Sequence, residues 1–149
     1  MPAKRRPDPS ARRIRQLERA LERLVEKDAP EDVLRQRAEV VLAQVAGISV
    51  AVLIANDHGR YIDANAAAVS LTGYSRAELL KLDLSQLTPD GGGATAPRLW
   101  RAFLRRGRMR GTYNLRRKDG TIVRARYVAV ANVLPGIHVS ALSRIAARP

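Results

Sequence analysis

Residues 48–81 read ISVAVLIANDHGRYIDANAAAVSLTGYSRAELLK, and this stretch decides the fold. Its first eight residues are nearly all apolar, a run that is too short for a stable helix and therefore predicts a buried strand. The next four residues, Asn-Asp-His-Gly, are typical of a tight turn, in which Gly59 can adopt a positive φ. Residues 60–64 predict a second strand, so the two are expected to pair as a hairpin.

Helix signals follow this hairpin. Asn65 precedes a run of small residues, and Gly73 interrupts it. Ser75 lies three residues before Glu78, which is the spacing of a capping box, where the serine hydroxyl accepts a bond from a free backbone N–H and the glutamate reaches back. Two short helices are therefore expected within residues 65–80.

The order of these elements resembles a PAS domain: strand, Asp-x-Gly turn, strand, Asn65 with small residues, then Gly-Tyr-Ser-x-x-Glu-Leu from Gly73. The later Arg-Lys-Asp-Gly sequence, which contains Asp119 and Gly120, resembles the second hairpin of that family. The resemblance covers residues 48–146. It implies an α+β fold with a five-stranded antiparallel sheet, helices on one face, and a sensory or interaction role rather than an enzymatic one.

The second hairpin has the clearest strand pattern. Residues 108–116 and 122–130 alternate between charged and uncharged side chains, and residues 137–145 predict a final strand. The uncharged face is expected to point inward, toward a helix that begins at Pro97 and turns Leu99 and Trp100 to the interior. If a small apolar ligand binds, the expected lining residues are Trp100, Phe103, Tyr113, Ala125 and Tyr127; a filled core without ligand is the alternative.

The N-terminal third predicts helices instead of strands. Residues 1–9 are expected to be a disordered basic tail, and residues 10–47 two amphipathic helices, the first capped by Ser10. A helix with so narrow an apolar stripe needs a partner, which is either this chain's sheet or a second copy. In many PAS proteins such a helix packs on the outer face of the sheet and mediates dimerisation. The residues expected to dimerise are Ile14, Leu17, Leu21, Leu24, Leu34 and Val41.

Composition limits the remaining possibilities. The chain has 149 residues, no cysteine and a net charge of +13, so disulfides are excluded. It lacks an apolar run near the ~18 residues that span a membrane, and its charged N-terminal region does not read as a secretory signal, so a cytoplasmic protein without membrane contact is expected. Residues 147–149 are expected to be a tail.

The basic residues suggest a competing function. Between Arg98 and Arg126 there are eleven basic residues and one acid, which would suit a nucleic-acid-associated regulator. Aromatic residues for base stacking are not interleaved with them. The three consecutive glycines at 91–93 predict a mobile loop without the phosphate-binding pattern. The arginines proposed for polyanion contact are Arg101, Arg105, Arg108, Arg110, Arg116 and Arg117.

Catalysis and metal binding have little support. The only histidines are His58, expected in an exposed turn, and His138, expected to be satisfied or exposed in the last strand. Asp57, Asp63 and Asp119 are expected to be turn and strand-edge groups. Residues 70–107 contain neither histidine nor methionine, so the haem ligation usual in PAS relatives is not expected, and a cysteinyl flavin is excluded. The cofactor stays unknown; a non-covalent flavin, a fatty acid or another small apolar ligand is open.

These observations predict a stand-alone signalling module that dimerises through its N-terminal helices. Its state would change with a small apolar ligand or a signalling protein partner, in signal transduction or transcription regulation.

Overall fold

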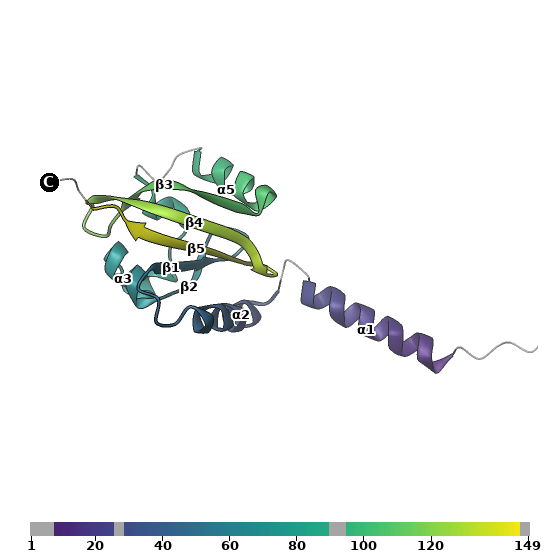
Figure 1. Ribbon diagram of the computed structural model, residues 1–149. Helices are drawn as coiled ribbons and strands as arrows, with labels where there is room; N and C mark the ends of the chain where they lie inside the picture. The colour runs from purple at the N-terminus through teal and green to yellow at the C-terminus, as the bar shows by residue number, and fades with distance from the viewer. Residues whose placement is uncertain (1–7, 26–28, 90–94, 147–149) are drawn as a thin grey trace, which may run out of the picture.

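The computed structural model describes residues 8–25, 29–89 and 95–146 (Figure 1). Residues 1–7 of the predicted 1–9 tail, the predicted tail at 147–149 and the glycine run at 91–93 lie outside the described residues. Within these limits, strands and helices form one domain from which the first helix projects.

The predicted five-stranded antiparallel sheet is confirmed, with strand order β2-β1-β5-β4-β3. β1 and β2 form the first hairpin, β3 and β4 the second, and β5 lies between them, paired with β1 and β4. The sheet therefore joins the two predicted hairpins through the last strand. The strands are β1 (Ala51–Ala55), β2 (Tyr61–Ala64), β3 (Arg108–Arg116), β4 (Ile122–Leu134) and β5 (Ile137–Arg144).

The alternation along β1 separates two apolar layers. Leu53 and Ala55 belong to the core on the inner face of the sheet, whereas Val52 and Ile54 belong to a second core on the outer face. All five residues of β1 are buried, as the unbroken apolar run predicted. The inner layer is covered by α3 (Ala66–Thr72), α4 (Arg76–Leu79), the 3-10 helix η1 (Leu84–Leu87) and α5 (Thr95–Arg106).

The predicted motif residues hold the connections between these elements. The Asn65 side chain caps α3 by accepting from the Ala68 N–H at 3.0 Å. It also donates to the carbonyl of Val50, just before β1, and accepts from the N–H of Val52 in β1. Gly73 ends α3 with φ +77°, a conformation that favours glycine. Asn65 and Gly73 therefore fix where α3 begins and ends.

Two further predicted motifs meet at the turn of the second hairpin. Ser75 and Glu78 form the capping box of α4, with the Ser75 hydroxyl accepting from the Glu78 N–H at 3.1 Å. Asp119 accepts from the Thr121 N–H at 2.9 Å, and Gly120 has a φ of +85°. Glu78 also pairs with Lys118 at 2.7 Å, which ties α4 to this turn.

The Glu78–Lys118 pair predicts a pH dependence of stability. The bond from Lys118, followed by the Ser75 backbone, lowers the pKa of Glu78 from 4.5 to about 2. Because the folded pKa is depressed, this stabilisation is complete above pH 4.5 and is lost as the pH falls toward 2. Urea unfolding of wild type and Glu78→Gln between pH 2 and pH 6 should show a steeper acid loss for wild type. Equal slopes for the two proteins would contradict the pairing, and Lys118→Gln should reduce the slope in part.

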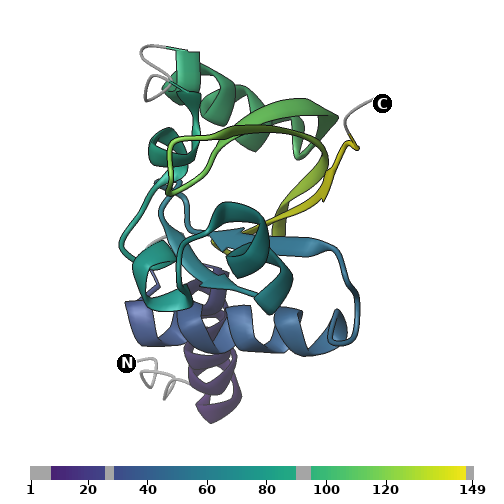
Figure 2. The ribbon, with the colours of Figure 1, turned by 90° about the vertical axis from the view of Figure 1, so that its left-hand side faces the viewer.

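α2 (Glu31–Gln44) corrects part of the dimerisation prediction. It runs along the sheet on the side away from α5 (Figure 2), where Leu34 and Val41 pack against the outer layer of β1, β2 and β5. Arg37 donates to the Pro135 carbonyl oxygen at 2.6 Å and anchors the helix to the β4–β5 turn. Leu34 is therefore buried and Val41 partly buried within their own chain, which leaves little of either side chain for a partner.

The outer face is only partly covered, in contrast to the prediction that both N-terminal helices cap it. α1 (Pro9–Val25) projects away from the sheet (Figure 1), and Ile14, Leu17 and Leu21 are 58%, 67% and 53% exposed. The side chain of Leu24 lies outside the described residues. α1 begins at Pro9 and not Ser10, because Asp8 accepts from the Ser10 N–H at 3.0 Å and acts as the cap.

Candidate functional site

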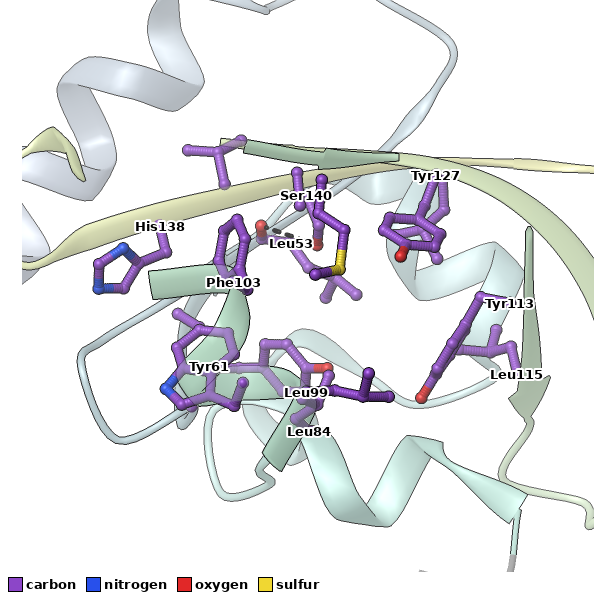
Figure 3. Close-up of a pocket in the computed structure, with 17 residues that line it drawn as sticks. Leu53, Tyr61, Leu84, Leu99, Phe103, Tyr113, Leu115, Tyr127, His138 and Ser140 are labelled. Carbon is purple, nitrogen blue, oxygen red and sulfur yellow. Dashed lines mark hydrogen bonds between the residues drawn. The ribbon is translucent and has the colours of Figure 1, made fainter. Parts of the chain in front are cut away.

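A cavity of about 130 Å³ lies between the inner face of the sheet and the helices α5 and η1 (Figure 3). Its walls are mainly apolar side chains from β1, β2, β3, β4, β5, η1 and α5. A dry engineered cavity of ~150 Å³ holds a benzene molecule, so the space suits a ligand of about that size. The cavity is therefore the strongest candidate for a binding site in the described residues.

Four of the five predicted lining residues surround this cavity. Trp100 and Phe103 come from α5, and Tyr113 and Tyr127 come from β3 and β4. Figure 3 shows the two tyrosines on one side of the space and Phe103 on the other. The aromatic pattern in α5 and the second hairpin thus identified most of the wall.

Ala125 is the exception among the predicted lining residues. It is buried, but it packs in the core beside Leu115 and Val123 and is not part of the cavity wall. Ala129, on the same face of β4 and opposite Met109, lines the cavity instead. The prediction was wrong because alternation along a strand gives the face of a residue and not the position of a cavity along that face.

Leu99 also departs from its prediction. It was expected to point inward, yet it is 53% exposed while still contributing to the lining. Leu99 therefore lies at the rim of the cavity and its neighbour Trp100 lies in the wall. A larger or smaller side chain at this position would change access to the cavity more than the core.

His138 is a site residue that sequence reasoning missed. It is 2% exposed, lines the cavity from β5, and contacts the aromatic residues of α5. Its ring centroid lies 5.5 Å from that of Trp100 and 6.2 Å from that of Phe103, both in edge-on arrangements. The three rings form one end of the cavity.

Both nitrogens of His138 are occupied. Nδ1 accepts from the Asn132 N–H at 3.0 Å, so the ring proton is on Nε2, which lies 2.7 Å from Asp57 Oδ1. Trp100 Nε1–H donates to the Asp57 carbonyl oxygen at 2.9 Å. Both ring nitrogens of His138 thus have hydrogen-bond partners, as predicted. Asp57 does more than form a turn, because its side chain and carbonyl join β5 and α5 to the β1–β2 hairpin.

The other predicted turn and strand-edge acids have structural roles. Asp63 lies on the edge strand β2, is buried, and pairs with Arg76 Nε at 2.9 Å. This carboxylate raises the pKa of Arg76 through the hydrogen bond and its charge. The described residues contain no group of three His, Cys, Asp or Glu side chains that could hold a metal ion.

The predicted polyanion residues fall into two groups. Arg101, Arg105, Arg108 and Arg110 are exposed, and no ion pair joins them to an acid within the described chain. Arg116 and Arg117 are instead used in the fold. Arg116 Nη2 donates to the Gln86 carbonyl at 3.2 Å, and Arg117 Nε donates to the Leu71 carbonyl at 3.0 Å.

Comparison with known families gives a match over residues 49–136 to the family described as PAS domain. A comparison with curated proteins finds no match. Across the residues that the structure describes, no helix is long and apolar enough to cross a membrane.

Solved structures show the same fold at low sequence identity. A PAS domain from Colwellia psychrerythraea is 21% identical, with a TM-score of 0.61, and the match covers 78% of this chain and 99% of that one. A domain of a sensory box sensor histidine kinase/response regulator from Geobacter sulfurreducens is 24% identical, with a TM-score of 0.58. The match covers 71% of this chain and 92% of that one. A third structure is the PAS domain of a LuxR-family transcriptional regulator from Burkholderia thailandensis, solved in complex with ethanol. It is 15% identical, with a TM-score of 0.59, and the match covers 71% of this chain and 97% of that one.

Proposed function

This chain belongs to the PAS domain family, and we propose that it is a signalling module whose state changes when a small apolar ligand enters the cavity, in signal transduction or transcription regulation. The observation that carries the proposal is the cavity itself, an apolar space of about 130 Å³ between the sheet and α5. Sensory PAS domains occur in signalling proteins and regulators such as the Geobacter sulfurreducens kinase.

The volume and the chemistry of the walls limit the ligand. Sites for drug-sized molecules enclose ~300–1,000 Å³, so this cavity suits a much smaller molecule than haem or a flavin. The polar groups of His138 and Asp57 bond each other, so the wall offers no free charge for an ionic ligand. The ethanol bound by the Burkholderia thailandensis domain shows that a PAS fold can accept a molecule of this scale.

The same contacts suggest how a bound ligand would alter the module. His138 faces the cavity, while its neighbour Ile137 packs in the outer layer under α2. Displacement of the His138 ring by a ligand would therefore move β5 against α2. The proposed output passes from α2 to α1. The exposed apolar seam of α1, formed by Ile14, Leu17 and Leu21, would hold a second copy or a signalling partner in the cytoplasm.

Filling the cavity tests this function. Ala129→Leu places a larger side chain in the space and is expected to weaken toluene binding at least ~10-fold, because several contact atoms of the ligand are displaced. Ala141→Leu is the matched control, since Ala141 lies on the neighbouring strand β5 opposite Val128 and outside the wall. Isothermal titration of toluene into both variants and wild type gives the affinities. Absence of toluene binding to wild type, or unchanged affinity in Ala129→Leu, would contradict the proposal.

Polyanion binding remains a second candidate because of Arg101, Arg105, Arg108 and Arg110. These side chains are exposed on α5 and β3 without acidic partners among the described residues. An affinity for RNA or DNA that falls steeply between low and moderate salt would support this alternative.

A further inference from the structure

We infer that the cavity selects small uncharged molecules that carry one carbonyl oxygen, which accepts a hydrogen bond from the hydroxyl of Tyr61. This inference rests on the proposed ligand-binding function and names the class of ligand. It depends on which polar groups around the cavity still have a hydrogen to donate.

Tyr61 has a free donor in an apolar wall. It is the first residue of β2, is 5% exposed and lines the cavity. Its hydroxyl makes no hydrogen bond with any residue that the structure describes, although every fully enclosed side-chain nitrogen and oxygen there has a partner. The Tyr61 oxygen is therefore one that the cavity reaches. Burial, and then the nearby Tyr113, raise the pKa of Tyr61, so its hydroxyl keeps its proton.

The hydroxyl of Tyr113 is already used. Thr88 donates its single hydroxyl hydrogen to the Leu84 carbonyl oxygen at 2.9 Å. Tyr113 and Thr88 also share a hydrogen bond, and in this bond Tyr113 must be the donor because the Thr88 hydrogen is taken. Tyr113 therefore has no hydrogen left for a ligand.

The polar groups at the other end of the cavity are also used. The indole N–H of Trp100 is donated to the Asp57 carbonyl, and the ring N–H of His138 to the Asp57 carboxylate. Ser140 Oγ lies 3.5 Å from the Leu53 carbonyl, the direction in which its hydrogen points. Among the hydroxyls and ring N–H groups considered so far, only that of Tyr61 keeps a hydrogen for an uncharged acceptor.

Tyr127 is the third tyrosine of the cavity wall, after Tyr61 and Tyr113. Its ring packs over Gly111 of the edge strand β3, and its hydroxyl lies 3.7 Å from the position a side chain would take there. Gly111 is exposed, so the Tyr127 oxygen can be satisfied by solvent. Tyr127 thus matches Tyr61 in residue type and in lining the cavity, but differs in burial.

The test compares two probes of equal shape. Cyclohexanone has a carbonyl oxygen where methylenecyclohexane has a CH₂ group. Each probe is measured by titration against wild type, Tyr61→Phe and Tyr74→Phe. Loss of one neutral hydrogen bond should weaken cyclohexanone binding to Tyr61→Phe about 3- to 10-fold and leave methylenecyclohexane unchanged. Tyr74→Phe, the same change at a tyrosine outside the cavity wall, should change neither affinity.

A spectroscopic readout separates bonding from a structural effect. The carbonyl stretch of bound cyclohexanone should lie at lower frequency in wild type than in Tyr61→Phe, because a hydrogen bond weakens the C=O bond. If Tyr61→Phe and wild type bind cyclohexanone with equal affinity and show equal stretch frequencies, the inference is overturned. Toluene binding to wild type would in that case still support the proposed function. If no probe binds wild type, both proposals fail. If Tyr61→Phe does not fold, wild type alone decides. A carbonyl stretch of bound cyclohexanone that is no lower than that of cyclohexanone in an apolar solvent would overturn the inference.

Discussion

Replacing Leu34 by alanine is expected to lower the free energy of unfolding by about 2–5 kcal/mol, a large share of the stability of a small domain. Leu34 is 8% exposed and packs with Val52, Ile54 and Ile62 on the outer face of the sheet. Truncation would leave a cavity under α2, and the rigid sheet below it could close that space only in part.

Val40 provides the matched control on the same helix. It is 54% exposed, so Val40→Ala should change the free energy of unfolding by no more than about 0.5 kcal/mol. Urea denaturation followed by far-ultraviolet circular dichroism gives both values. Equal effects of the two substitutions would mean that α2 is not part of the cooperatively folded domain.

The Leu34 prediction illustrates what the sequence could and could not decide. The apolar stripe of α2 was visible, including Leu34 and Val41, but such a stripe is satisfied equally by the chain's own sheet or by a second copy. Only the arrangement of β1, β2 and β5 shows that this stripe is buried internally. By contrast, the two hairpins and the turns at Gly73 and Gly120 depend on local chemistry, and they were predicted correctly.

The cavity was predictable only in outline for the same reason. Alternation in the second hairpin and the aromatic residues of α5 gave four lining residues, because each pattern is local. The Asp57–His138 bond joins residues 81 positions apart, and no local pattern specifies that pairing. A signal did exist: alternation in the last strand places His138 on the same face as Ser140 and Leu142, which is the inner face.

α1 presents the opposite case from α2, because its apolar seam is exposed in the single chain. Ile14, Leu17 and Leu21 are each more than half exposed, and a 17-residue helix with such a seam is marginal in water. Association of two copies along the seam would bury these side chains, each worth about 1.5–3 kcal/mol when removed from water. Homodimerisation through α1 is therefore the proposal that this surface supports best.

Leu17→Gln combined with Leu21→Gln is expected to raise the dissociation constant of this dimer at least ~100-fold, since four leucines would leave the interface of the pair. The control is Arg15→Gln combined with Arg19→Gln, which introduces the same residue type beside the predicted seam and should leave the dimer intact. Sedimentation equilibrium measures the association, and circular dichroism should show helix content falling with it, because α1 would lose the surface that stabilises it. A wild-type monomer, or a dimer unaffected by the leucine substitutions, would refute a role for α1 in self-association and leave its seam to a different protein.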